Sequence, residues 1–123
     1  MLLPNGKRAI VDIRKLHDYC LNADHPRGGA KARVFARVLG ISARDASKLK
    51  SRLLKVAISE EAVIGELDVY GQRYTIDFEM KTEVGTAVIR SGWIVLHKES
   101  SPRLTTCYVR KRKKSDQEEN KTP

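Results

Sequence analysis

The sequence predicts an α+β domain in which three N-terminal helices pack on a three- to four-stranded antiparallel sheet. Apolar residues recur at helical spacing only in the first half of the chain, and from about residue 61 they alternate with polar residues, as in half-buried strands. A chain of 123 residues has room for one hydrophobic core. We therefore expect a single domain over residues 1–109, followed by a basic, disordered tail over residues 110–123.

Each predicted helix has its own start or stop signals. Asp12 can cap a first helix, and a polar, glycine-containing loop around Pro26 ends it. A second helix is expected from about Ala30 to Leu39, with Gly40 as its C-terminal signal. Ser42 is a good N-cap for a third helix.

The strands follow from alternation and turn residues. Residues 73–80 alternate strictly, and Gly71 marks a turn between them and an earlier segment at residues 66–70. The segment Thr86–Leu96 is apolar on both faces at its ends, which predicts a central position in the sheet. Leu104–Val109 is the last predicted strand.

The charge of the chain indicates its class of partner. Lysine and arginine number 24 against 15 acidic residues, a net charge of +9, and the predicted tail accounts for only +3 of it. A domain this positive attracts polyphosphates through long-range steering and counterion release. We predict a nucleic acid as the partner. A solvated basic surface and a site for an acidic protein are the alternatives.

Several classes of protein are not expected. No apolar run is long enough to span a membrane, and the N-terminus lacks a signal-peptide core, so we expect a cytoplasmic protein without membrane contact. The two cysteines have no CxxC spacing and are expected to be buried small hydrophobes. No nucleotide loop or zinc spacing is present, and the three histidines are far apart. We therefore expect no cofactor and no metal site.

The loop before the second helix is the first candidate site. His25 can titrate near neutral pH, the glycines after it leave backbone N–H groups open at a helix N-terminus, and Lys31 lies in the first helical turn. An exposed loop histidine and a solvated lysine are the alternative interpretation.

The second candidate lies in the predicted central strand. Arg90 is flanked by apolar residues, so it must face a cleft or form an ion pair, with Asp77 or Glu79 on the neighbouring strand as partner. Gly92 indicates a bulge or the close approach of a ligand. Trp93 is either a core residue or a stacking platform for a base.

The last strand supplies the third candidate. Thr106 and Tyr108 could position a phosphate, although threonine and tyrosine are also ordinary strand residues. Further nucleic-acid contacts are predicted at five positions, namely Arg27, Arg73, Ser91, Lys111 and Arg112.

Four segments occur in a recognisable order, "KLHDYCLNADHPRGGAKARVFARVLGI", "ELDVYGQRYTIDFEM", "VIRSGWIV" and "PRLTTCYV". Together they resemble a family of small bacterial domains that occur alone and as C-terminal tips of polymorphic secreted toxins. The resemblance covers about residues 3–109. The toxin context and the layout of helices followed by a sheet are similar to the barnase–EndoU–colicin–RelE ribonuclease superfamily.

This resemblance implies a metal-independent endoribonuclease, in which a ribose 2′-OH attacks the adjacent phosphorus under general acid–base catalysis. His25 would be the acid or base, Lys31 and Arg90 would bind the phosphate, and Thr106 and Tyr108 would position it. A stand-alone toxin would need a neutralising antitoxin or immunity partner. The alternative is a basic nucleic-acid- or protein-binding module without catalysis, such as an antitoxin, an immunity protein or a phage accessory protein.

Overall fold

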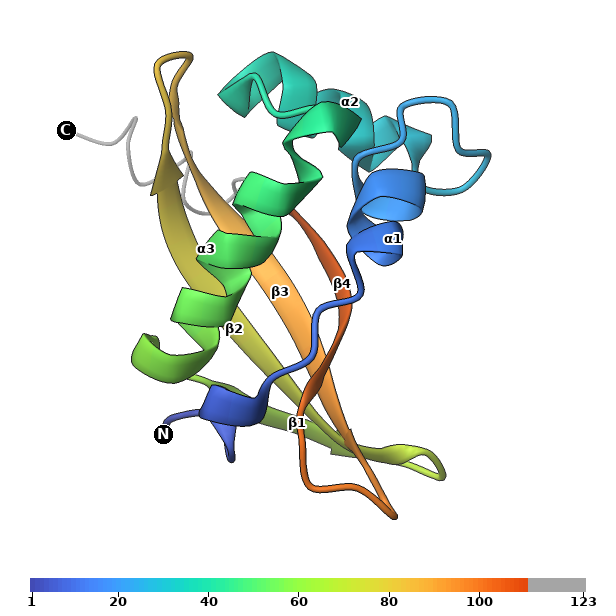
Figure 1. Ribbon diagram of the computed structural model, residues 1–123, viewed down its shortest axis with the longest axis vertical. Coiled ribbons are helices and arrows are strands. Elements are labelled where there is room, and N and C mark those ends of the chain that lie inside the picture. Colours follow the sequence, from blue (N-terminus) through green and yellow to red (C-terminus); the bar gives the residue numbers. More distant parts are fainter. Residues whose placement is uncertain (111–123) are drawn as a thin grey trace, which may run out of the picture.

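The computed structural model describes residues 1–110 and shows an α+β fold in which helices cover one face of a four-stranded antiparallel sheet (Figure 1). The helices are α1 (Ile13–Lys15), continued by a π-helical turn (Leu16–Cys20), α2 (Gly29–Leu39) and α3 (Ala46–Ser59). The strands are β1 (Val63–Leu67), β2 (Gly71–Lys81), β3 (Thr86–Leu96) and β4 (Arg103–Val109). The predicted fold class is confirmed in this form, with four strands rather than three.

The sheet is a meander with the strand order β1-β2-β3-β4. β2 and β3 pair along their whole length, from Gly71 opposite Leu96 to Lys81 opposite Thr86. The central position predicted for the strand over residues 86–96 is confirmed, because β3 has a neighbour on each side. β1 and β4 are therefore the two edges of the sheet.

The predicted helix signals are present in the structure. The side chain of Asp12 accepts a hydrogen bond from the backbone N–H of Arg14. α2 ends at Gly40, whose φ of 67° lies in the left-handed region that glycine adopts without strain. Ser42 and Asp45 form a capping box, but a 3₁₀ turn over Ala43–Asp45 separates Ser42 from the first residue of α3.

The helices do not begin the chain, which corrects the prediction of a simple N-terminal run of helices. An extended segment precedes them and crosses the fold, forming isolated bridges from Leu2 to Glu61 and from Ile10 to Arg103. A short 3₁₀ turn, Gly6–Arg8, interrupts this segment. These bridges join the segment to Glu61, which precedes β1, and to Arg103, the first residue of β4. The sequence pattern had assigned the segment to no helix or strand.

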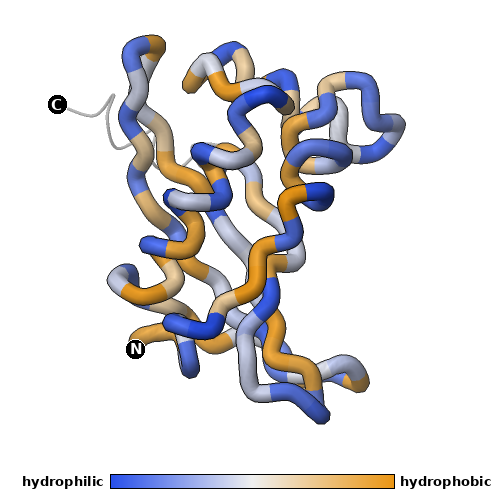
Figure 2. Tube along the Cα trace, in the orientation of Figure 1, coloured by the Kyte–Doolittle hydropathy of each residue, from blue (hydrophilic) through white to orange (hydrophobic). Residues whose placement is uncertain are grey.

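One hydrophobic core lies between the helices and the sheet. Ile76 and Phe78 from β2 and Ile89 and Trp93 from β3 point into it, and Trp93 is only 1% exposed. The interpretation of Trp93 as a core residue is therefore confirmed. Figure 2 shows the hydrophobic positions along the strands and helices and the hydrophilic loop that precedes α2.

The predicted tail lies almost wholly outside the described residues. Only Arg110, its first residue, is described, and it is held at the end of β4 by a backbone hydrogen bond to Val88. Among residues 1–110, no helix combines the length and apolar character that a membrane crossing requires.

Candidate nucleic-acid interface

A row of polar side chains crosses the sheet face that the helices leave open. Asp77 on β2, Arg90 on β3 and Tyr108 on β4 are paired in register across the three strands. Their chain neighbours Ile89 and Cys107 point into the core. Because side chains alternate along a strand, the row lies on the opposite face.

Arg90 is held by Asp77 through two hydrogen bonds. Its Nε and Nη2 donate to the two carboxylate oxygens of Asp77, at 2.8 and 2.9 Å. Arg110 also donates to Asp77, at 3.2 Å. The Asp77 carboxylate raises the pKa of Arg90, and the nearby Tyr108 hydroxyl acts in the same direction. Of the two predicted ion-pair partners for Arg90, the structure selects Asp77 and not Glu79.

Lys31 extends this row beyond the edge of the sheet. It lies in the first turn of α2, and its ammonium nitrogen is 4.2 Å from the centre of the Tyr108 ring. A cation at this distance from an aromatic ring is attracted to it. We call Lys31, Asp77, Arg90, Tyr108 and Arg110 the edge cluster. Its three cations and one carboxylate give a net formal charge of +2.

The arrangement brings together three of the five residues predicted for catalysis. Lys31, Arg90 and Tyr108 come from α2, β3 and β4, and no sequence spacing connects them. The fourth, Thr106, faces Gly92 in the register of β3 and β4.

Gly92 lies at the bulge expected from the sequence. The register between β3 and β4 shifts after Gly92, which leaves Thr105 as the extra residue on β4. A Cβ at position 92 would lie 2.9 Å from the hydroxyl oxygen of Thr105 and 3.3 Å from the methyl carbon of Thr106. Glycine therefore gives these two threonines room on the sheet.

His25 lies at the same end of α2 as Lys31 but has a structural environment of its own. Its ring stacks on Tyr19, with centroids 4.6 Å apart and planes inclined by 6°. Its Nδ1 accepts hydrogen bonds from the backbone N–H groups of Arg27 and Gly28, both at 3.0 Å. Because Nδ1 is an acceptor, the ring proton is on Nε2. His25 thus holds the loop that leads into α2.

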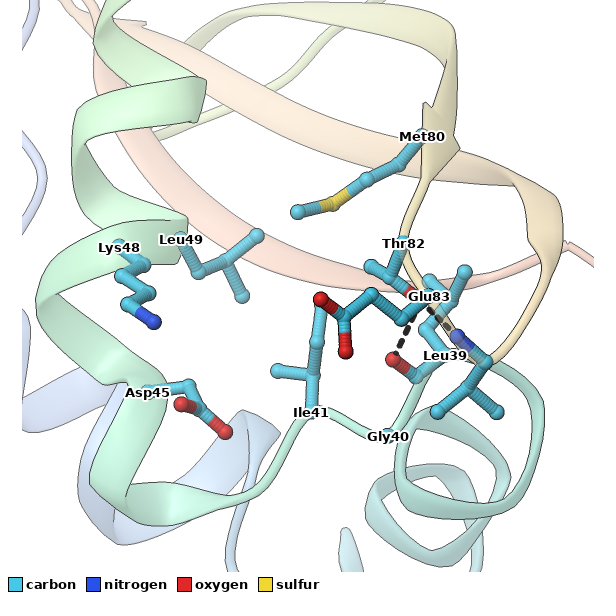
Figure 3. Close-up of a pocket in the computed structure, with 10 residues that line it drawn as sticks. Leu39, Gly40, Ile41, Asp45, Lys48, Leu49, Met80, Thr82 and Glu83 are labelled. Carbon is cyan, nitrogen blue, oxygen red and sulfur yellow. Dashed lines mark hydrogen bonds between the residues drawn. The ribbon is translucent and has the colours of Figure 1, made fainter.

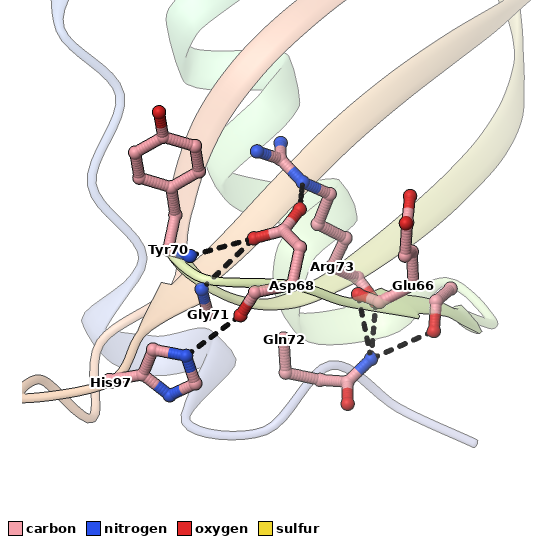
Figure 4. A network of polar contacts seen from close by, with 8 residues as sticks. Glu66, Asp68, Tyr70, Gly71, Gln72, Arg73 and His97 are labelled. Atoms are coloured by element: carbon pink, nitrogen blue, oxygen red, sulfur yellow. Dashed lines mark hydrogen bonds and ion pairs between the residues drawn. The ribbon is translucent and has the colours of Figure 1, made fainter.

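Two of the predicted nucleic-acid contacts are separated from the edge cluster. The Nε of Arg73 donates to Asp68 at 2.6 Å, next to the turn between β1 and β2 (Figure 4). Ser91 has 0% exposure, donates to the carbonyl of Ile76 and accepts from the indole N–H of Trp93. Ser91 thus makes its hydrogen bonds inside the core, and we leave it out of the interface.

The other three predicted contacts lie in two separate segments of the chain. The side chain of Arg27 is exposed in the loop before α2, close to His25 in sequence. Lys111 and Arg112 lie outside the described residues. Within the described part, no group of three or more His, Cys, Asp or Glu side chains is arranged to hold a metal ion.

A hollow lies at the C-terminal end of α2, beside the β2–β3 hairpin (Figure 3). Its volume is about 420 Å³, and the charged ends of Asp45, Lys48 and Glu83 surround an apolar floor. The Thr82 hydroxyl fixes the hairpin by donating to the carbonyl of Leu39 at 2.8 Å. Of the residues that the sequence singled out for chemistry, those within the described part of the chain do not line this hollow.

The two cysteines are buried, as predicted, but they are neighbours rather than isolated thiols. Cys20 ends the π-helical turn and Cys107 points inward from β4. A hydrogen bond from the Cys107 thiol lowers the pKa of Cys20 to about 7. The same contact and burial raise the pKa of Cys107 well above its usual value. The two thiols are therefore hydrogen-bonded to each other in the core.

Comparison with known families found a match that covers most of the chain. Residues 2–111 match the profile of a domain of unknown function, DUF6883. The chain belongs to the DUF6883 family. Comparisons with curated proteins and with solved structures gave no match.

Sequence reasoning missed two features of this DUF6883 domain. Arg110 was assigned to the tail, although its guanidinium binds Asp77. A hollow of about 450 Å³ between α2 and β4, lined by Ala30, Val34 and Val109 besides Lys31 and Tyr108, was also missed. The i, i+4 spacing of Ala30 and Val34 was the available signal, because it places both on one face of α2.

Proposed function

We propose that the chain is an RNA-binding domain of the metal-independent endoribonuclease kind, with the edge cluster as its phosphate site. The observation that carries the proposal is the convergence of Lys31, Arg90 and Tyr108, from three separate elements, on one edge of the sheet. The resemblance to small toxin domains and the net charge of +9 support the same class of substrate.

The edge cluster retains donors for a phosphate. A guanidinium has five N–H groups, and Asp77 uses two of those on Arg90. Lys31 presents an exposed ammonium group, and the Tyr108 hydroxyl adds a neutral donor. Asp77 fixes the orientation of Arg90, so the remaining guanidinium donors are preorganised for a planar anion.

The reaction proposed is attack of a ribose 2′-OH on the adjacent phosphorus. The bond to the 5′-oxygen breaks, which leaves a 2′,3′-cyclic phosphate and a free 5′-OH. A base removes the proton of the 2′-OH and an acid protonates the leaving oxygen. Lys31 and Arg90 stabilise the charge that develops on the phosphorane oxygens, with Tyr108 and Thr106 positioning the group.

His25 is the candidate for the proton transfers, but only after a rearrangement. Its Nδ1 receives two backbone N–H groups and its Nε2 carries the proton, so neither nitrogen can accept a proton as the loop stands. To act as a base, His25 has to release the amides of Arg27 and Gly28. A structural role for His25 is therefore the competing assignment.

The same observation favours a second candidate function, a basic RNA-binding module without catalysis. Such a module needs the phosphate donors of the edge cluster and no titrating group. It would lose affinity gradually as cations are removed, whereas an enzyme loses turnover entirely with one essential group.

Incubation of the purified chain with bacterial RNA in the presence of EDTA distinguishes the endoribonuclease from the non-catalytic binding module. The enzyme proposal expects discrete cleavage fragments with 2′,3′-cyclic phosphate ends, and no fragments with Lys31→Ala or Arg90→Ala. His25→Ala should also abolish cleavage if His25 transfers the proton. Intact RNA that still shifts on a native gel would overturn the enzyme proposal and leave the binding module.

The proposal that the chain is a toxin is tested by its effect on bacterial growth. An endoribonuclease in the cytoplasm arrests growth on induction unless a neutralising partner is present. Growth arrest that is rescued by an adjacent open reading frame would support a toxin with its antitoxin or immunity protein. Normal growth at high expression of the folded chain would contradict it.

A further inference from the structure

The hollow between α2 and β4 lies directly beside the edge cluster. It is bounded by Ala30, Lys31 and Val34 on α2 and by Tyr108 and Val109 on β4, and its volume is about 450 Å³. Volumes of roughly 300–1,000 Å³ are typical of small-molecule sites. Of the five lining residues within residues 1–110, three are purely aliphatic, so this lining is apolar with charge at one end.

This combination of surfaces restricts what the hollow can bind. An inorganic phosphate would leave the aliphatic side chains of Ala30, Val34 and Val109 uncovered. A purely apolar ligand would leave Lys31 without an anionic partner. A flat ring with apolar faces, attached to a phosphodiester, satisfies both the aliphatic wall and the cation.

From this geometry we infer that the hollow accepts an unpaired nucleobase of single-stranded RNA. The base lies against the aliphatic wall and the Tyr108 ring, and the phosphate next to it contacts Lys31 and Arg90. The inference rests on the proposed function and names its substrate class. A base within a duplex is stacked and paired, so it cannot enter the hollow unless it leaves the helix.

The test compares four fluorescent probes of about 12 nucleotides by anisotropy. They are a mixed-sequence single-stranded RNA, its blunt duplex, the same sequence as single-stranded DNA, and an abasic single strand with the same number of phosphates. The inference expects the single-stranded RNA to bind about tenfold more tightly than the duplex or the abasic strand. Equal affinity for these three probes would overturn it, and tighter binding of the DNA would overturn the assignment to RNA.

Two variants on α2 locate the effect. Ala30 is exposed and lines the hollow, so Ala30→Trp should fill it and weaken single-stranded RNA binding about tenfold without changing duplex binding. Ala36 is exposed on the same helix but does not line the hollow, so Ala36→Trp is the matched control. If both variants fold and weaken single-stranded RNA binding equally, the inference is overturned.

Failure of the inference differs from failure of the proposed function. RNA cleavage that requires Lys31 but is insensitive to Ala30→Trp would refute the base site and retain the endoribonuclease. Base-dependent binding that is lost in Ala30→Trp, without any cleavage, would support the base site and refute the endoribonuclease.

Discussion

The ammonium group of Lys31 lies over the ring of Tyr108, 4.2 Å from its centre, and so joins the first turn of α2 to the edge strand β4. Tyr108 is in turn paired with Arg90 in the register of β3 and β4. A single contact therefore connects the first turn of α2 to the charged row on the open sheet face. The consequences of this contact can be measured separately for stability and for RNA binding.

Replacing Lys31 by alanine should weaken RNA binding much more than it weakens the fold. An exposed cation–π contact contributes about 0.5–1 kcal/mol, so the loss of unfolding free energy should not exceed that range. RNA affinity should fall, and the slope of log K against log salt should decrease by about one, as expected for one lost phosphate contact. Lys48→Ala removes the same charge from an exposed position on α3 and is the control. Equal losses of affinity would mean that only net charge matters, and Lys31→Arg should retain binding if the position matters.

Neutralising Asp77 should change stability and RNA affinity in opposite directions. Asp77 accepts hydrogen bonds from Arg90 and Arg110, so Asp77→Asn leaves two guanidinium charges without their counterion. We expect unfolding free energy to fall by about 1 kcal/mol, because the pair is partly exposed. RNA affinity should rise, with a steeper salt dependence, in titrations at several salt concentrations. A fall in both quantities would show that the orientation Asp77 gives to Arg90 matters more for binding than the positive charge that Asp77 neutralises.

Ser91→Ala should destabilise the fold without affecting RNA binding. The buried hydroxyl donates to the carbonyl of Ile76 and accepts from the indole N–H of Trp93. Its removal leaves the indole donor unpaired in the core, which costs about 1–3 kcal/mol. Urea unfolding followed by the fluorescence of Trp93 measures this cost, and Ser47→Ala at an exposed position of α3 should cost little. Weaker RNA binding by the folded Ser91 variant would restore the nucleic-acid role that the sequence suggested for this position.

Ser91 also shows how far the sequence determines the site. The sequence predicted β3 and its central position from local alternation, and it offered the ion pair of Arg90 with the neighbouring strand as one of two interpretations because a buried charge is costly. Alternation along β3 places Ser91 on the same face as Ile89 and Trp93, but its hydrogen bonds to Ile76 and Trp93 depend on tertiary packing, which no local pattern encodes. The convergence of Lys31 with Tyr108 depends on the angle at which α2 meets the sheet edge, which no periodicity encodes.

The fold was predictable to a similar degree. The helix ends at Asp12 and Gly40 follow from local hydrogen bonding and were placed correctly, whereas Ser42 begins a 3₁₀ turn that precedes α3. The extended N-terminal segment was not predicted, because its bridges to Glu61 and Arg103 are long-range contacts with little sequence pattern. The role of Nδ1 of His25 was equally inaccessible, since it depends on the path of the loop backbone.

Asp68→Asn should destabilise the chain at neutral pH and have no effect in acid. The carboxylate of Asp68 accepts hydrogen bonds from Arg73 and from the backbone N–H groups of Tyr70 and Gly71, and these bonds lower its pKa, with Arg73 as the main cause (Figure 4). A carboxyl group whose pKa is lower in the folded than in the unfolded state stabilises the fold fully above its ordinary pKa of 3.8. This contribution disappears as the pH falls through the folded-state value.

Thermal unfolding of the wild type and of Asp68→Asn over a range of pH measures this contribution. The difference in midpoint should have its full size above pH 3.8 and should shrink as the pH falls below that value. Asp24→Asn, at an exposed carboxylate in the loop before α2, is the control and should show little difference at any pH. A difference for Asp68→Asn that persists unchanged into acid would mean that the β1–β2 turn depends on the hydrogen-bonding geometry of the side chain and not on its charge.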